Sequence, residues 1–132
     1  MTKKLQVYRI PELPRESLRE GFLTRTAIRS DDCIVTFNWF APGSPDQPPH
    51  SHPFDQLAFV LQGSMVFIVD GVDYLLEAGN AIRIPASVPH TSRVVGDGMA
   101  LNVDVFAPAR EDYLYLAVNA SEYQPDNNQN QG

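Results

Sequence analysis

The chain has 132 residues, of which 43% are hydrophobic and 20% charged, and this composition predicts one globular domain with its own core. Its formal charge of -6, with ten scattered Lys and Arg residues, excludes the clustered cations that bind nucleic acid. The sequence has no evident signal peptide and no apolar run of ~20 residues, so we expect no membrane contact and a cytoplasmic location.

The first elements in chain order are short and separated by proline and glycine. Residues 9–22 are a poor strand candidate, and we expect a short helical turn within 12–19. Runs rich in β-branched and aromatic residues then predict strands at 33–40, 57–62, 64–69, 72–77, 80–85 and 100–106. The single cysteine, Cys33, is expected to be a small buried hydrophobe in the first of these.

The turns between these runs and the C-terminal part complete the predicted domain. Asp70-Gly71 predicts a tight hairpin, and a second turn is expected at 96–98. A short helix is expected after Pro108, and the polar tail 121–132 is expected to be disordered. Many short strands with tight turns predict an all-β sandwich or barrel, with a single domain at 1–120.

All three histidines of the chain lie in or near turns beside these strands. His50 and His52 are two residues apart, so on a regular strand they would point to the same face, as would Gln56. His90 follows the predicted strand 80–85. An H-x-H pair is weak evidence alone, and each of these residues is more often an ordinary polar side chain. Together they indicate a metal site, because imidazole nitrogens bind Zn, Ni, Fe or Mn and an amide oxygen completes the set.

The spacing around these residues resembles the two motifs of the cupin superfamily. Gly43-x6-His50-x-His52-x3-Gln56-x6-Gly63 is similar to the first motif, and Gly79-x5-Pro85-x4-His90 to the second. The resemblance implies a single-domain jelly-roll barrel, a double-stranded β-helix with short helical turns near the termini and a barrel core at about 33–106. It also implies that His50, His52, Gln56 and His90 bind a divalent transition metal. Three positions depart from the motifs: Gln56 replaces the usual Glu, Ser87 a Gly and Val94 an Asn.

The glutamine affects the charge of the implied site. Three neutral imidazoles and a carboxylate would leave a divalent site with about one positive charge, whereas Gln56 leaves about two. A more positive metal resists oxidation and acts more strongly as a Lewis acid. We therefore expect non-redox chemistry, such as isomerisation, ring opening or elimination, and attraction of an anionic substrate.

The predicted strand 100–106 provides a second group of candidate residues. Asn102, Asp104 and Phe106 share one face, which we expect to point into the barrel, opposite Leu101, Val103 and Val105. An inward carboxylate is costly unless it is paired or functional. Arg110, just after the strand, could return over the barrel mouth and bind a substrate carboxylate. The alternative is an Asp104 at a strand edge and a solvated Arg110, paired with Glu111 or Asp112.

The run from Asp104 to Leu114 resembles that of small cupins from pectin and alginate degradation. The resemblance implies conversion of 4,5-unsaturated monouronates to linear keto forms, with Asp104, Phe106 and Arg110 as catalytic residues. The alternatives are a cupin dioxygenase or lyase acting on another small organic acid, and a cupin that binds a small molecule without catalysis. Further pocket candidates are Arg25, Trp39 and Tyr74. They are not included in the predicted site, because the sequence does not show which face of its strand each side chain occupies.

The expected assembly follows from the outer face of the same strands. Apolar residues there would leave an exposed patch on a monomer, and a homodimer would bury it. These residues are Leu57, Phe59, Leu61, Val103 and Val105.

Overall fold

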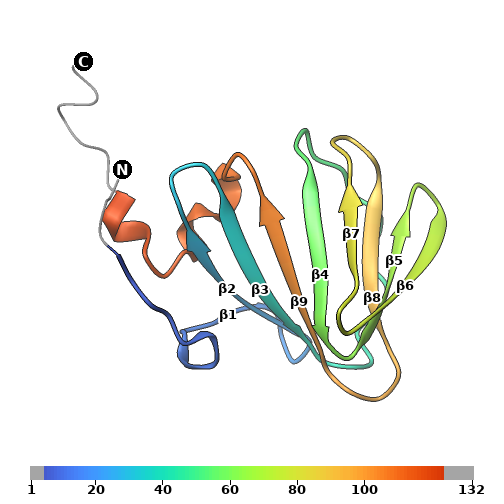
Figure 1. Ribbon diagram of the computed structural model, residues 1–132. Helices are drawn as coiled ribbons and strands as arrows, with labels where there is room; N and C mark the ends of the chain where they lie inside the picture. Colours follow the sequence, from blue (N-terminus) through green and yellow to red (C-terminus); the bar gives the residue numbers. More distant parts are fainter. Residues whose placement is uncertain (1–4, 124–132) are drawn as a thin grey trace.

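The computed structural model describes residues 5–123, and these residues form two antiparallel sheets with short 3-10 helices near both ends (Figure 1). The larger sheet has six strands in the order β1-β2-β3-β9-β4-β7. Their bounds are Glu16–Arg19, Leu23–Arg29, Ile34–Phe40, Ala100–Phe106, Gln56–Gln62 and Ala81–Ile84. The smaller sheet has the order β6-β5-β8, with bounds Val72–Glu77, Ser64–Val69 and His90–Val95. The predicted all-β class is confirmed.

The turns between strands form where the sequence allows positive φ angles. Asp70 and Gly71 have φ angles of 50° and 80° and join β5 to β6, as a type I′ hairpin requires. Gly96, with φ of 87°, begins the turn from β8 to β9. Both predicted turns are therefore confirmed. Ser87, which stands where the cupin motif has glycine, also adopts a positive φ of 67°.

The inner face of the large sheet contains both the apolar core and a row of polar side chains. Arg25 lies opposite Asn38, and Asn38 lies opposite Asn102, across β2, β3 and β9. On one side of this row, Leu23 and Phe40 belong to the main apolar cluster. The predicted alternation of β9 is confirmed, because its inward residues Asn102, Asp104 and Phe106 are all buried.

The N-terminal prediction was wrong in part. The first helical turn is η1 (Ile10–Glu12), and residues 16–19 form β1 rather than a helical turn. β1 pairs with β2, a strand at 23–29 that local sequence did not predict, so tertiary pairing decides both. The large sheet therefore begins well before residue 33.

The C-terminal segment returns to the start of the chain. The expected short helix after Pro108 is η2 (Glu111–Leu116), and the chain then passes β2, where Val118 N donates to Ala27 O at 2.8 Å. The expected disordered tail at 121–132 overlaps η3 (Ala120–Tyr123), and the remainder of that tail lies outside the described residues. In Figure 1 these helical turns lie beside β2.

Two single-residue outcomes complete the fold. Cys33 is half-buried and lies just before β3 rather than within it. Gly63 connects β4 to β5 with φ of 75°, and a Cβ atom there would lie 2.4 Å from Met99 O. Only glycine fits this position. Within residues 5–123, no helix is long and apolar enough to cross a membrane.

Candidate metal centre

The first two histidines lie in the extended connection before β4. His50 forms an isolated bridge with His90, each backbone N donating to the other's O at 2.9 Å. His52 lies two residues further on, just before a bend at 53–54, and β4 begins only at Gln56. The expected regular strand through all three residues is therefore wrong. Prolines on both sides of the pair, Pro49 and Pro53, lack the N–H that a strand ladder needs.

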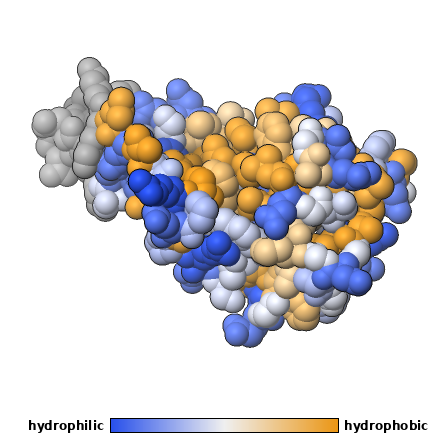
Figure 2. Space-filling model, turned by 60° about the horizontal axis from the view of Figure 1, so that its bottom comes forward, coloured by the Kyte–Doolittle hydropathy of each residue, from blue (hydrophilic) through white to orange (hydrophobic). Residues whose placement is uncertain are grey.

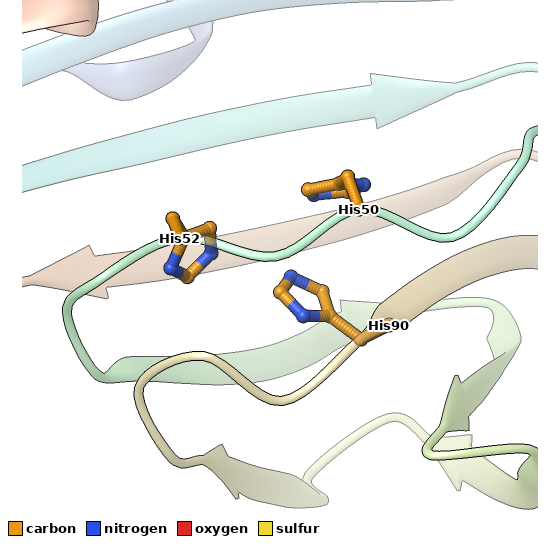
Figure 3. Close-up of side chains that lie close together, drawn as sticks. All are labelled: His50, His52 and His90. Carbon is orange, nitrogen blue, oxygen red and sulfur yellow. The ribbon is translucent and has the colours of Figure 1, made fainter.

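The three imidazoles nevertheless converge on one point (Figure 3). His50, His52 and His90 each offer one ring nitrogen, and these nitrogens all lie within 4.8 Å of one another. Ring centroids are 4.4 Å apart for His50 and His90, and 4.8 Å apart for His52 and His90. The backbone bridge between residues 50 and 90 brings two distant parts of the chain into this contact.

Hydrogen bonds to the backbone fix the orientation of two of the rings. His52 Nδ1 lies 2.9 Å from Phe54 O, and His90 Nδ1 lies 2.9 Å from Val88 O. A carbonyl oxygen only accepts, so each Nδ1 carries the proton and each Nε2 keeps a lone pair. Backbone anchoring of this kind orients metal-binding histidines in known sites.

The Nε2 atoms lack the partners that buried polar atoms normally have. His90 Nε2 is buried and has no hydrogen-bond partner among residues 5–123. His52 Nε2 lies 3.2 Å from Gln56 Oε1, so an imidazole lone pair faces a carbonyl oxygen. A cation between these atoms would satisfy both. The donor set therefore fits a divalent transition metal held by His50, His52, His90 and Gln56.

The protonation of the histidines supports the same reading. Burial, with smaller contributions from His90 and His52, lowers the pKa of His50 to about 4, although part of its side chain reaches solvent. Burial also lowers the pKa of His90. Both rings are thus neutral at physiological pH, which is the form that binds metal.

Asp104 lies beside this cluster on the inner face of β9. Its carboxylate accepts hydrogen bonds from Asn102 Nδ2 at 3.0 Å and from Asn38 Nδ2 at 3.3 Å. Burial raises the pKa of Asp104, and its hydrogen bonds to Asn102 and Gln56 oppose that rise. The strand-edge alternative for Asp104 does not describe this structure, because the side chain is buried.

Arg110 and Phe106 form the neighbouring wall. The Arg110 guanidinium lies 3.6 Å from the ring centroid of Tyr113 and 4.7 Å from that of Phe106. Its Nε and Nη2 donate to the two carboxylate oxygens of Asp112 at 2.8 and 2.6 Å, which holds the pKa of Asp112 below its usual value. The pair with Asp112 that belonged to the alternative is therefore present, but Arg110 is not solvated, because its side chain is only 10% exposed and lines the cavity. Carboxylate binding by Arg110 remains a prediction.

A single cavity of about 270 Å³ joins these residues. The predicted residues His50, Gln56, His90, Asp104, Phe106 and Arg110 all line it. The cavity is also lined by Arg19, Arg25 and Tyr113, which were not in the predicted site. The alternation of residues 23–29 was the available indication for Arg25. Of the other two pocket candidates, Trp39 lies on the outer face beneath Arg15, and Tyr74 is 45% exposed on β6.

The chain is similar to known proteins in both sequence and structure. A cupin domain matches residues 39–106. The pectin degradation protein KdgF of Dickeya dadantii is 32% identical over 104 residues, which cover 78% of this chain and 93% of that protein. An RmlC-like cupin from Shewanella frigidimarina superposes with a TM-score of 0.73 and 26% identity, covering 86% of this chain and 99% of that one. KdgF from Halomonas sp. gives a TM-score of 0.73 at 24% identity, covering 83% and 98%.

The two sheets and the histidine cluster define a small β-barrel protein with a candidate metal centre. The matched domain and the Dickeya relative then establish the family, and the chain belongs to the cupins.

Proposed function

We propose that this protein is a metal-dependent, non-redox enzyme that converts 4,5-unsaturated monouronates, or a similar small sugar acid, to the linear keto form. The observation that supports this most directly is a buried carboxyl, Asp104, beside the histidine cluster in a cavity that three arginines line. The relative at 32% identity is named as a pectin degradation protein, which supports a substrate derived from a sugar polymer. The cavity volume of about 270 Å³ suits one small sugar acid.

The metal ligands in this proposal are His50, His52, His90 and Gln56. Since all four are neutral, a divalent Zn, Ni, Mn or Fe ion would keep about two positive charges. When bound, such an ion supplies Lewis-acid polarisation of a substrate oxygen. The buried Nε2 of His90 and the facing Nε2 and Oε1 atoms of His52 and Gln56 support this ligand set.

Asp104 moves the proton in the proposed reaction. The anomeric hydroxyl of the sugar acid loses its proton, the bond from the anomeric carbon to the ring oxygen breaks, and the ring oxygen takes up a proton to form an enol. The enol formed then gains a proton on carbon and loses its hydroxyl proton, so no atom is gained or lost. A carboxyl whose pKa is raised by burial is better suited to accept and return such a proton than an exposed one. Asn38 and Asn102 hold that carboxyl in place.

Phe106 and Arg110 complete the proposed site. Phe106 is 2% exposed and gives the sugar ring an apolar wall that excludes water. Arg110 retains one Nη group that Asp112 does not use, and this group and its charge are available to a substrate oxygen. The cationic wall favours an anionic substrate in a protein whose overall charge is -6.

One assay tests the proposal. Purified protein is loaded with Zn²⁺, Ni²⁺, Mn²⁺ or Fe²⁺, its metal content is measured, and loss of the ultraviolet absorbance of an unsaturated monouronate is followed. We expect turnover that requires metal and consumes no oxygen, and Asp104→Ala is expected to abolish it. Oxygen uptake would favour a dioxygenase. Full turnover by Asp104→Ala, or none by any metal-loaded protein, would contradict the proposal.

The proposed enzyme acts as a homodimer through the outer face of the large sheet. Leu57 is 43% exposed and Leu61 is 55% exposed, which supports the expected patch. Val103, expected in the same patch, is only 8% exposed, because Phe37 and Phe59 flank it across the sheet. Figure 2 shows apolar side chains gathered across the middle of one face of the molecule.

A further inference from the structure

Arg110 has limited capacity to bind a carboxylate. A guanidinium binds a carboxylate most strongly through two parallel N–H groups. The Nε and Nη2 groups of Arg110 already make such a pair with Asp112, at 2.8 and 2.6 Å. Two of its five N–H groups are used in this way, so the edge formed by Nε and Nη2 is closed to a substrate carboxylate, and the charge of Arg110 is already paired with that of Asp112.

Arg25 is a second guanidinium in the same cavity, and its outer groups are available. Its side chain extends from the inner face of β2, and its Nε donates to Asn38 Oδ1. Neither of its Nη groups donates to a protein atom within residues 5–123. Its guanidinium carbon lies 4.7 Å from the Tyr113 ring centroid, while that of Arg110 lies 3.6 Å from the same centroid. Tyr113 therefore contacts both arginines.

Arg19 brings a further positive charge to the same wall. It lies opposite Leu23 on β2 and lines the cavity together with Arg25, and its Nη1 donates to Ser44 Oγ at 2.9 Å. Burial and the nearby charge of Arg25 lower the pKa of Arg19. Asp104 is the only carboxylate among the described lining residues, against three arginines. Cations that converge in this way favour an anion between them.

We propose that Arg25 binds the carboxylate of the substrate through its two Nη groups, and that Arg19 and Arg110 add charge on either side. This inference rests on the proposed function, because it names the contact that selects an acidic sugar. Asn38 accepts from Arg25 and donates to Asp104, so one side chain fixes both groups relative to each other. A carboxylate held at Arg25 thereby places the sugar ring toward Asp104 and the histidines.

A binding measurement tests this contact without turnover. Zinc-loaded protein is titrated calorimetrically with D-galacturonate, a saturated acid, and with its methyl ester, which lacks the charge. The wild-type protein is expected to bind the acid more tightly than the ester. Arg25→Gln is expected to weaken binding of the acid roughly 30-fold or more and to leave the ester unchanged. Arg25→Lys keeps the charge but loses the pair of parallel N–H groups, so its affinity for the acid is expected to lie between those of the wild type and Arg25→Gln.

Arg93→Gln is the matched control, because Arg93 is exposed on β8 and does not line the cavity. It removes the same charge and is expected to change neither affinity. Zinc content and Tm are measured for each variant, and Arg25→Lys is decisive if Arg25→Gln does not fold. Equal affinity of wild type and Arg25→Lys for the acid, or equal loss in Arg93→Gln, would overturn the inference.

Kinetics separate this inference from the proposed function. On an unsaturated monouronate, Arg25→Lys is expected to raise KM more than it lowers kcat, since it removes a binding contact. If the wild-type protein binds galacturonate through Arg25 but turns over no unsaturated uronate, the proposed function fails and the carboxylate site stands. If it turns over uronates and Arg25→Lys leaves KM unchanged, the carboxylate site fails and the proposed function stands.

Discussion

The Nε2 atom of His52 faces the Oε1 atom of Gln56 at 3.2 Å, and His52 Nδ1 is fixed by Phe54 O. Two lone pairs therefore point at each other on the buried side of the cluster. This arrangement is unfavourable in the metal-free protein and favourable around a cation, so metal binding and folding stability should be coupled.

The first prediction is that metal stabilises the fold. When zinc is added back to a chelator-treated sample, its free energy of unfolding is expected to rise by about 4 kcal/mol once free Zn²⁺ reaches about 1,000 times Kd. This corresponds to a Tm rise of roughly 10–20 °C. His90→Ala removes a buried proposed ligand and is expected to lose most of that rise, measured by scanning calorimetry. Thr91→Ala, one residue along β8, is the control and keeps it. Equal zinc responses in wild type and His90→Ala would show that His90 does not bind the ion.

The second prediction concerns the choice of glutamine. Gln56→Glu adds a carboxylate to the ligand set, so zinc affinity is expected to rise on the order of tenfold or more. Activity on an unsaturated uronate is expected to fall, because the added charge weakens the Lewis acid. Gln62→Glu, at the exposed end of the same strand, is the control that adds charge outside the site. Unchanged zinc affinity in Gln56→Glu would remove Gln56 from the ligand set.

The candidate site was predictable from sequence because its residues occupy positions that short motifs define. Gln56, Asp104 and Phe106 all lie on the inner faces of strands whose alternation was visible. His50 and His90 occupy ligand positions that the two motifs imply, and the structure brings them together through a backbone bridge. The exact path of the His50–His52 segment was not predictable. The spacing of its histidines is compatible with a regular strand, but the flanking prolines lack the N–H groups that such a strand would need for its hydrogen bonds.

Arg25 and the first two strands show where local sequence is insufficient. Residues 16–19 have little strand propensity, and they form β1 only because β2 offers an edge with which to pair. Because the sequence did not predict that pairing, it did not show which face of the sheet the Arg25 side chain points to, and Arg25 was not assigned to the cavity. The pair between Arg110 and Asp112 also depends on how η2 turns after Pro108, which the sequence leaves open.

The third prediction concerns the Arg110–Asp112 pair. Asp112→Asn removes the charge that orients Arg110, so KM for an acidic substrate is expected to change while zinc affinity stays constant. Stability is expected to fall by about 1 kcal/mol or less, because the Asp112 side chain is 59% exposed. Glu111→Gln, an exposed neighbouring acid, is the control. A KM equal to that of the wild type would show that Arg110 keeps its position without Asp112.

The contribution of the Arg110–Asp112 pair to the free energy of unfolding is expected to depend on pH. Hydrogen bonding by Arg110 lowers the folded-state pKa of Asp112 below its ordinary value of 3.8. Its stabilisation is therefore present above about pH 4 and is lost as the pH falls through the lower folded-state value. The difference in unfolding free energy between wild type and Asp112→Asn is expected to be constant from pH 7 to about pH 5 and to shrink in more acidic solution. A difference that grows on acidification would contradict the pair.

The fourth prediction concerns assembly. The wild-type protein is expected to be a dimer by light scattering coupled to gel filtration, and the double variant Leu57→Lys/Leu61→Lys is expected to be a monomer. Leu75→Lys, which changes a leucine 57% exposed on the other sheet, is the control and should remain dimeric. A monomeric wild type, or a double variant that remains dimeric, would exclude this sheet face as the interface.

The fifth prediction concerns Gly63, a position at which both the φ angle and the surrounding atoms require glycine. Gly63→Ala forces a side chain into a left-handed backbone conformation and places Cβ 2.4 Å from Met99 O, a backbone atom that β9 holds in place. The expected cost is about 3 kcal/mol or more, since strain and overpacking add. Gly71→Ala has a similar φ of 80° but no heavy atom within 4 Å, so it measures the backbone cost alone, about 1 kcal/mol. Equal losses in urea unfolding of the two variants would show that β9 moves aside at Met99, and that this turn does not fix the strand that holds Asp104.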